Sequence, residues 1–104
     1  VRDAFQERRD RLVNGLNRLA PLRCVLPSGA FYAWCNVQGL GLSSETMARQ
    51  WLDEALVATV PGEGFGAPGF IRFSFATTLE VIDETLTRLA TWLTSTHAAR
   101  VKGT

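Results

Sequence analysis

The sequence predicts an α+β fold, a small and mostly antiparallel sheet of about four strands with helices packed on one face. Three stretches carry apolar residues at spacings of three and four, as amphipathic helices do. The stretches between them are short, bounded by glycine or proline, and rich in aromatic or branched residues, as strands are. The predicted order is α-β-β-α-β-β-α, and helices on one face of the sheet would bury all the apolar stripes together.

The first helix is predicted over residues 1–20, where apolar residues recur at helical spacing and arginines crowd the opposite side. Its apolar stripe comprises Phe5, Leu12, Leu16 and Leu19. Pro21 ends this helix, because proline has no N–H for the helical hydrogen bonds. Residues 22–26 then predict a short strand, and residues 27–29 a turn.

Residues 30–37, with the sequence AFYAWCNV, predict a second strand rich in aromatic side chains. One face carries Phe31, Ala33, Cys35 and Val37, and the other carries Tyr32, Trp34 and Asn36. A second helix is capped by Ser43 or Ser44, and Glu45 favours the positive end of its dipole. Its predicted apolar stripe comprises Met47, Trp51, Leu52 and Ala55.

Residues 56–60 predict a third strand, and residues 70–76 a fourth with strict alternation. In the fourth strand one face carries Ile71, Phe73 and Phe75, and the other carries Phe70, Arg72, Ser74 and Ala76. The last helix begins near Thr77 or Thr78. Its stripe comprises Leu79, Ile82, Leu86, Leu89 and Leu93. We therefore expect one domain over residues 1–96 and a polar C-terminal tail over residues 97–104.

Composition and charge argue against several classes of protein. The 104 residues have the size of a single domain, although the first residue is valine and the chain is expected to be part of a longer protein. Eleven basic and ten acidic residues are too evenly balanced to indicate binding of nucleic acid or an anionic membrane. No apolar run reaches the ~20 residues of a membrane span, and the charged start is unlike a signal peptide. Cys24 and Cys35 form no CxxC motif, so we expect two reduced thiols in a cytoplasmic protein.

Residues 64–69, GFGAPG, match the dinucleotide-binding pattern G-x-G-x-x-G. That motif requires a helix directly after the glycines, because the helix N-terminus binds the pyrophosphate. Here a predicted strand follows instead, and Pro68 removes a backbone donor. The match is therefore interpreted as accidental. The loop either satisfies turns that need positive φ or brings the backbone close to a neighbouring surface ahead of Arg72.

Arg72 is the most informative candidate for function. It lies in the middle of the fourth predicted strand between Ile71 and Phe73, which indicates partial burial. A guanidinium in such surroundings needs an anionic partner, because an unpaired buried charge is costly. Its planar fork suits a carboxylate held by two parallel hydrogen bonds. The residues alone leave three alternatives open: a carboxylate ligand, an internal salt bridge, or a side chain extended to solvent.

Three quoted segments together resemble the carboxy-terminal part of class I aminotransferases, the pyridoxal-phosphate (PLP) enzymes of the aspartate aminotransferase family, fold type I. They are FQERRDRLVNGLN, PSGAFYAW and VATVPGEGFGAPGFIRFSFAT, and the resemblance extends from Val1 to Leu93 in the family's order and spacing. It implies a small C-terminal domain completed by a segment from the protein's amino terminus. It also implies that Arg72 binds the substrate α-carboxylate and that Phe31 lies near the substrate entrance.

The resemblance further implies which parts of the enzyme lie elsewhere. The lysine that binds PLP as a Schiff base, the acidic partner of the pyridine nitrogen and the phosphate-binding cup belong to a large domain upstream. Lys102 is the only lysine of this chain and lies in the predicted tail, as does His97, so neither is expected to be catalytic. We therefore expect no PLP and no activity on this stretch alone. The implied partners are amino-acid and 2-oxo-acid substrates, the large PLP-binding domain of the same chain, and a second subunit in a homodimer.

The parent protein implied by the resemblance transfers an amino group from an L-amino acid to a 2-oxo acid. Three alternatives stay open. The same domain occurs in PLP enzymes of other reaction types, such as β-lyases, synthases and decarboxylating members. It also occurs in transcription regulators that carry an aminotransferase-like module. Finally, an independent binding module could use Arg72 for an acidic ligand.

Overall fold

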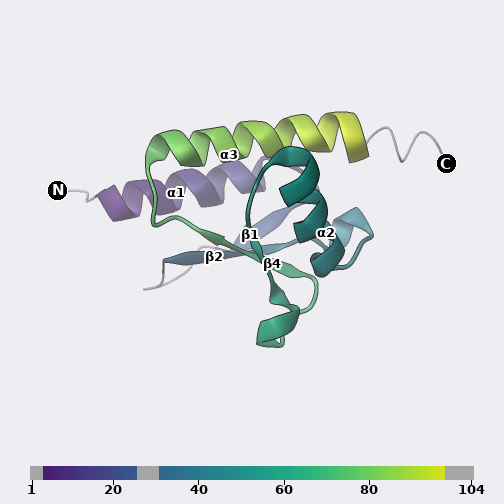
Figure 1. Ribbon diagram of the computed structural model, residues 1–104. Coiled ribbons are helices and arrows are strands. Elements are labelled where there is room, and N and C mark those ends of the chain that lie inside the picture. The colour runs from purple at the N-terminus through teal and green to yellow at the C-terminus, as the bar shows by residue number, and fades with distance from the viewer. Residues whose placement is uncertain (1–3, 26–30, 98–104) are drawn as a thin grey trace.

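The computed structural model describes residues 4–25 and 31–97. Helices lie on one side of a four-stranded sheet, and the order of the main elements is α1, β1, β2, α2, β3, β4, α3 (Figure 1). The predicted α+β class and the predicted order of helices and strands are both confirmed. No helix in the described part of the chain is both long and apolar enough to cross a membrane.

Helix α1 spans Ala4–Asn17, three residues short of the predicted end. Leu12, Val13 and Leu16 are buried, and Phe5 and Leu19 pack against the same core. The helix ends at Asn17 because the side chain of this residue turns to the backbone of Cys24. Its amide donates to the Cys24 carbonyl at 2.8 Å, and its oxygen accepts from the Cys24 N–H at 2.7 Å. Asn17 thereby provides hydrogen-bond partners for the Cys24 backbone on the outer edge of β1.

The sheet has the order β1-β2-β4-β3, and all its neighbouring strands are antiparallel. Its strands are β1 (Arg23–Val25), β2 (Tyr32–Asn36), β3 (Val60–Pro61) and β4 (Phe70–Ser74). The predicted strand over residues 56–60 is largely wrong. Leu56 has a φ of 58°, in the left-handed region that a strand excludes, so pairing begins only at Val60. The turn predicted at residues 27–29 lies outside the described residues.

Helix α2 spans Ser44–Gln50 and continues as a π-helical turn, η2, over Trp51–Ala55. Ser43 is the N-cap, since its hydroxyl oxygen accepts the Thr46 N–H at 3.1 Å. The buried residues of these two elements include Met47, Ala48, Trp51 and Ala55. Leu52 was predicted to be buried but is 53% exposed. It follows Trp51 directly, and one residue turns a helix by roughly 100°, which takes Leu52 out of the core.

Helix α3 spans Leu79–Trp92, with Thr78 as its N-cap, and a π-helical turn, η4, continues over Leu93–His97. Its buried side is lined by Ile82, Leu89, Trp92 and Leu93. Helix α3 runs along α1, and both lie over the same face of the sheet (Figure 1). The predicted tail at residues 97–104 falls almost wholly outside the described residues, and His97 is the last residue of the η4 turn.

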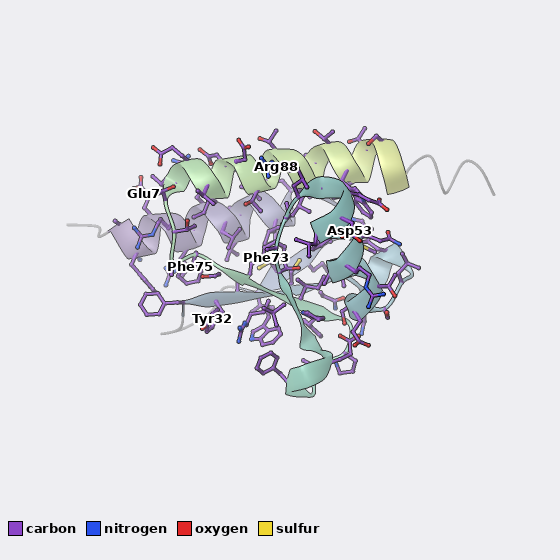
Figure 2. All side chains as sticks on the ribbon, viewed as in Figure 1. Glu7, Tyr32, Asp53, Phe73, Phe75 and Arg88 are labelled. Atoms are coloured by element: carbon purple, nitrogen blue, oxygen red, sulfur yellow. The ribbon has the colours of Figure 1, made fainter. Side chains whose placement is uncertain are left out.

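The strands divide their side chains between two different surroundings. The face toward the helices is buried, with Ala33, Cys35, Ile71, Phe73 and Phe75 each at most 4% exposed. Figure 2 shows Phe73 and Phe75 on this side and Tyr32 on the other. The second face, called here the helix-free face, carries Tyr32, Trp34, Asn36, Phe70, Arg72 and Ser74, which are half-buried or exposed. The predicted alternation of β2 and β4 is confirmed for these residues.

Candidate functional site

Arg72 lies at the centre of β4 on the helix-free face. Trp34 of β2 is its register partner on one side, and Val60 of β3 is its partner on the other. Neighbouring strands on both sides fix the backbone of Arg72, so its side chain leaves the sheet in a defined direction. The side chain is half-buried, as its apolar sequence neighbours predict.

Two aromatic rings contact the guanidinium of Arg72. Its Cζ lies 4.0 Å from the ring centroid of Tyr32 and 4.8 Å from that of Phe65. Both distances are in the range of cation–π attraction. Phe65 is itself held by Trp34, whose ring lies 5.9 Å away in an edge-to-face arrangement. The guanidinium therefore contacts two aromatic rings, and a third ring packs against one of them.

No carboxylate among the described residues forms an ion pair with Arg72. The internal salt bridge that the sequence left open is therefore absent from the described part of the chain. Arg72 also forms no hydrogen bond to another described residue, so its N–H donors have no partner among these residues. A guanidinium whose faces are covered and whose donors are open is arranged to accept a planar anion at its edge.

A hollow of about 160 Å³ lies beside this guanidinium. It is lined by Tyr32, Ala58, Thr59, Val60, Arg72 and Ser74. Arg72 is the only charged residue in this lining, so the hollow carries positive charge with hydroxyl groups around it. A carboxylate matches its charge, because Arg72 supplies two donors in the geometry of a carboxylate.

The glycine-rich loop holds the edge of this site together. Its 3₁₀ turn η3, Gly62–Phe65, lies on the helix-free side of the sheet, away from α1 and α3 (Figure 1). The Ser44 hydroxyl donates to Glu63 at 2.7 Å, and the Glu45 N–H donates to the same carboxylate at 3.2 Å. These two hydrogen bonds hold the pKa of Glu63 below its ordinary value, and the bond from Ser44 has the larger effect. The loop is thereby fastened to the start of α2, with Phe65 against Arg72.

The same loop leads directly into a strand, as predicted. Strand β4 begins at Phe70, one residue after the last glycine of the GFGAPG segment. No helix therefore begins at these glycines, and the helix N-terminus that a dinucleotide pyrophosphate requires is absent from this part of the described chain. The interpretation of the motif as accidental agrees with this arrangement.

Phe31 does not lie beside Arg72. Its ring packs edge-to-face against Phe5 of α1 at 4.9 Å and lies 6.4 Å from the ring of Phe75. Both partners belong to the helix-covered side of the sheet, whereas Arg72 projects from the other side. Phe31 is nevertheless 53% exposed. Its assignment to the substrate entrance stays a prediction, and within this chain the two predicted site residues do not meet.

Sequence reasoning missed Tyr32 and Phe65 as neighbours of Arg72. The sequence does indicate the face on which Tyr32 lies, because the alternation of its strand separates it from the buried residues. What was missing is the register, which pairs Tyr32 with Ser74 and so brings its ring diagonally next to Arg72. For Phe65 no local pattern exists, since its position depends on the fold of a loop.

The acidic residues, histidines and cysteines of the described part of the chain do not gather into a metal site. The described residues contain no group of three or more His, Cys, Asp or Glu side chains placed to hold a metal ion. Cys24 and Cys35 are free and buried, and burial raises the pKa of these thiols to about 11 and about 12. The single lysine, Lys102, lies outside the described residues, so none of these residues offers an amine to bind PLP covalently.

Comparison with known proteins identifies the family of this chain. The family model described as aminotransferase class I and II matches residues 1–89. The chain belongs to this family. Among its curated relatives, the putative aminotransferase YugH of Bacillus subtilis is 39% identical over 98 residues. That match covers 92% of this chain and 25% of YugH. The aspartate/prephenate aminotransferase of Nitrosomonas europaea is also 39% identical, over 88% of this chain and 26% of its own length.

Solved aminotransferase structures share the fold as well. The aromatic aminotransferase of Pyrococcus horikoshii OT3 superimposes with a TM-score of 0.83 at 36% identity, covering 86% of this chain and 24% of that one. The aspartate aminotransferase of Rhizobium meliloti gives a TM-score of 0.82 at 37% identity, covering 85% and 24%. This aminotransferase-family chain thus spans about a quarter of the length of the relatives it matches.

Proposed function

We propose that this chain is the small C-terminal domain of a PLP-dependent aminotransferase, and that Arg72 binds the α-carboxylate of its substrates. The whole enzyme transfers an amino group from an L-amino acid to a 2-oxo acid. One observation carries the assignment of Arg72. Its guanidinium lies beside a hollow on the helix-free face with no carboxylate partner among the described residues.

The chemistry of the substrates suits a single arginine. Amino acids and 2-oxo acids differ at the α-carbon but share the carboxylate next to it, so one guanidinium can hold both. Each charge-assisted hydrogen bond contributes roughly 1.5–3 kcal/mol. Two parallel bonds also fix the orientation of the α-carbon relative to the reacting groups, which lowers the entropic part of the barrier.

The remaining catalytic parts are assigned to the portion of the protein outside this chain. When bound there, PLP supplies the electron sink that amino transfer requires. The described residues include no lysine that could bind PLP covalently, whereas Arg72 offers donors for a substrate carboxylate. We accordingly assign residues 1–96 to the small domain and residues 97–104 to a tail. Alone, the chain holds no PLP and is inactive.

The helix-free face is the surface that would meet the large PLP-binding domain. It carries Arg72 and exposes apolar rings, with Tyr32 at 41% and Phe65 at 56% exposure. Closure of the small domain over this face would bury the hollow and exclude water from the carboxylate. Phe31, directly before the first residue of β2, would line the entrance. We further propose that the enzyme is a cytoplasmic homodimer.

The test is kinetic and uses the full-length enzyme. Arg72→Ala removes both donors to the carboxylate, so kcat/KM should fall by about tenfold to a thousandfold for amino and oxo acid alike. Arg49→Ala is the matched control, because this arginine is exposed on α2 and lies away from the hollow. Unchanged kinetics in Arg72→Ala would return this residue to a purely structural role.

A further inference from the structure

An arginine that binds substrate must be held in place before the substrate arrives. Its long side chain has several rotatable bonds, and fixing them costs roughly 2 kcal/mol of entropy. In many sites a neighbouring carboxylate fixes the guanidinium, but none of the described carboxylates pairs with Arg72. Another part of the structure must therefore hold it.

Tyr32 is placed by the sheet to do this. It pairs with Ser74, whereas Arg72 pairs with Trp34, so Tyr32 and Arg72 are diagonal neighbours on the helix-free face. The Arg72 Cζ lies 4.0 Å from the Tyr32 ring centroid, which is closer than its 4.8 Å distance to Phe65. A ring against the guanidinium occupies its π face and leaves the N–H groups at the edges free for an anion.

Phe65 supports the arrangement from the loop. Its ring contacts both Arg72 and Trp34. The turn that carries it is joined to α2 by the hydrogen bond from Ser44 to Glu63. One of the two rings therefore belongs to β2, and the other belongs to a turn that is hydrogen-bonded to α2. Neither contact depends on a charged partner that would compete with a carboxylate ligand.

We propose that Tyr32, supported by Phe65, is a positioning residue that orients the Arg72 guanidinium for carboxylate binding through the face of its ring. This inference rests on the proposed role of Arg72 and adds a residue to it. The Tyr32 hydroxyl has no part in this role, so a phenylalanine at the same place performs it equally well. Phe65, at the longer distance, contributes less.

The experiment compares variants of the full-length enzyme. Tyr32→Leu removes the ring, and KM for amino and oxo acid should both rise about threefold to tenfold, with kcat changed less. Tyr32→Phe should restore the wild-type KM. Leu52→Ala is the control, because Leu52 is an exposed apolar side chain on η2 and does not belong to the helix-free face.

A double-mutant cycle separates this inference from the proposed function. If Tyr32 acts through Arg72, then Tyr32→Leu should not raise KM further in an Arg72→Ala background. A normal KM in Tyr32→Leu, alongside a damaged Arg72→Ala enzyme, would overturn the positioning role and leave the function of Arg72 intact. An equal loss in both backgrounds, or a failure of Tyr32→Phe to restore KM, would also overturn it. Normal kinetics in Arg72→Ala itself would remove the proposed function and this inference together.

Discussion

The hydroxyl of Ser44 donates a 2.7 Å hydrogen bond to the carboxylate of Glu63, which lies nineteen residues further along the chain. Ser44 is completely buried, and its oxygen also accepts the Gly69 N–H at 3.0 Å. One buried hydroxyl thus joins the start of α2 to both ends of the glycine-rich loop. The position of Phe65, and through it the surroundings of Arg72, depends on this junction.

Acidic pH should weaken the interaction between Ser44 and Glu63. The pKa of Glu63 is held below its ordinary value, chiefly by the Ser44 hydrogen bond, so the unfolded chain binds a proton at higher pH than the folded chain does. The stabilisation is therefore complete above the unfolded pKa, near 4.5, and is lost as pH falls through the lower folded value. Thermal unfolding of this chain between pH 6 and pH 3 should show a fall in Tm.

Glu63→Gln tests the assignment, because its amide does not titrate. Its Tm should start lower at pH 6 and decline less on acidification than that of the wild type. Glu80→Gln is the control, since Glu80 lies exposed in the first turn of α3. Parallel Tm curves for wild type and Glu63→Gln would show that Glu63 does not carry the acid sensitivity.

The two thiols should be protected in the folded chain. Cys24 and Cys35 are register partners on β1 and β2, and burial raises the pKa of these thiols to about 11 and about 12. Because the thiolate is the reactive form, a thiol reagent at pH 8 should modify the native chain slowly and the urea-unfolded chain rapidly. The rate of modification, followed by absorbance, gives the comparison.

The same shifts predict a loss of stability at alkaline pH. The folded pKa values exceed the unfolded value near 9, so the unfolded chain loses its thiol protons first as pH rises. The stabilisation that comes from the protonated thiols is therefore fully present below about pH 9 and declines above it. Rapid labelling of both cysteines in the native chain at pH 8 would contradict the burial on which this prediction depends.

Local patterns predicted those parts of the fold that depend on nearest neighbours. Alternation gave the two faces of β2 and β4, and the N-cap hydroxyls of Ser43 and Thr78 marked where α2 and α3 begin. The third strand was predicted too long. Its β-branched composition favours a strand, but tertiary packing places Leu56 in the left-handed region and the Val57 N–H bonds back to the Trp51 carbonyl at 3.0 Å.

The candidate site could be predicted only in part. A charged residue between two apolar ones in a strand identified Arg72, because that pattern is rare without a ligand or a partner. Its neighbours Tyr32 and Phe65 come from a strand and a loop, and only strand register and loop anchoring bring them to the guanidinium. Phe31 follows the alternation of its strand and meets Phe5 of α1, a contact between distant segments that no local pattern encodes.

The loop offers a last prediction, from two glycines that differ in their surroundings. Gly62 is buried, and a Cβ placed on it would overlap the Ala67 carbonyl oxygen and lie 2.8 Å from that of Phe70. Both obstacles are backbone atoms of the loop and of β4, so they cannot move without breaking the turn. A Cβ on Gly64 would meet nothing within 4 Å, and its φ is outside the left-handed region.

Gly62→Ala should therefore destabilise the chain by about 2–3 kcal/mol, whereas Gly64→Ala should change its stability by at most about 1 kcal/mol, toward greater stability. For a domain of this size the first change corresponds to a fall in Tm of roughly 8–24 °C. Because the displaced turn carries Phe65, Gly62→Ala should also raise KM in the full-length enzyme, while Gly64→Ala should not. Equal Tm values for the two variants would mean that the close approach of the backbone at Gly62 is not what shapes this loop.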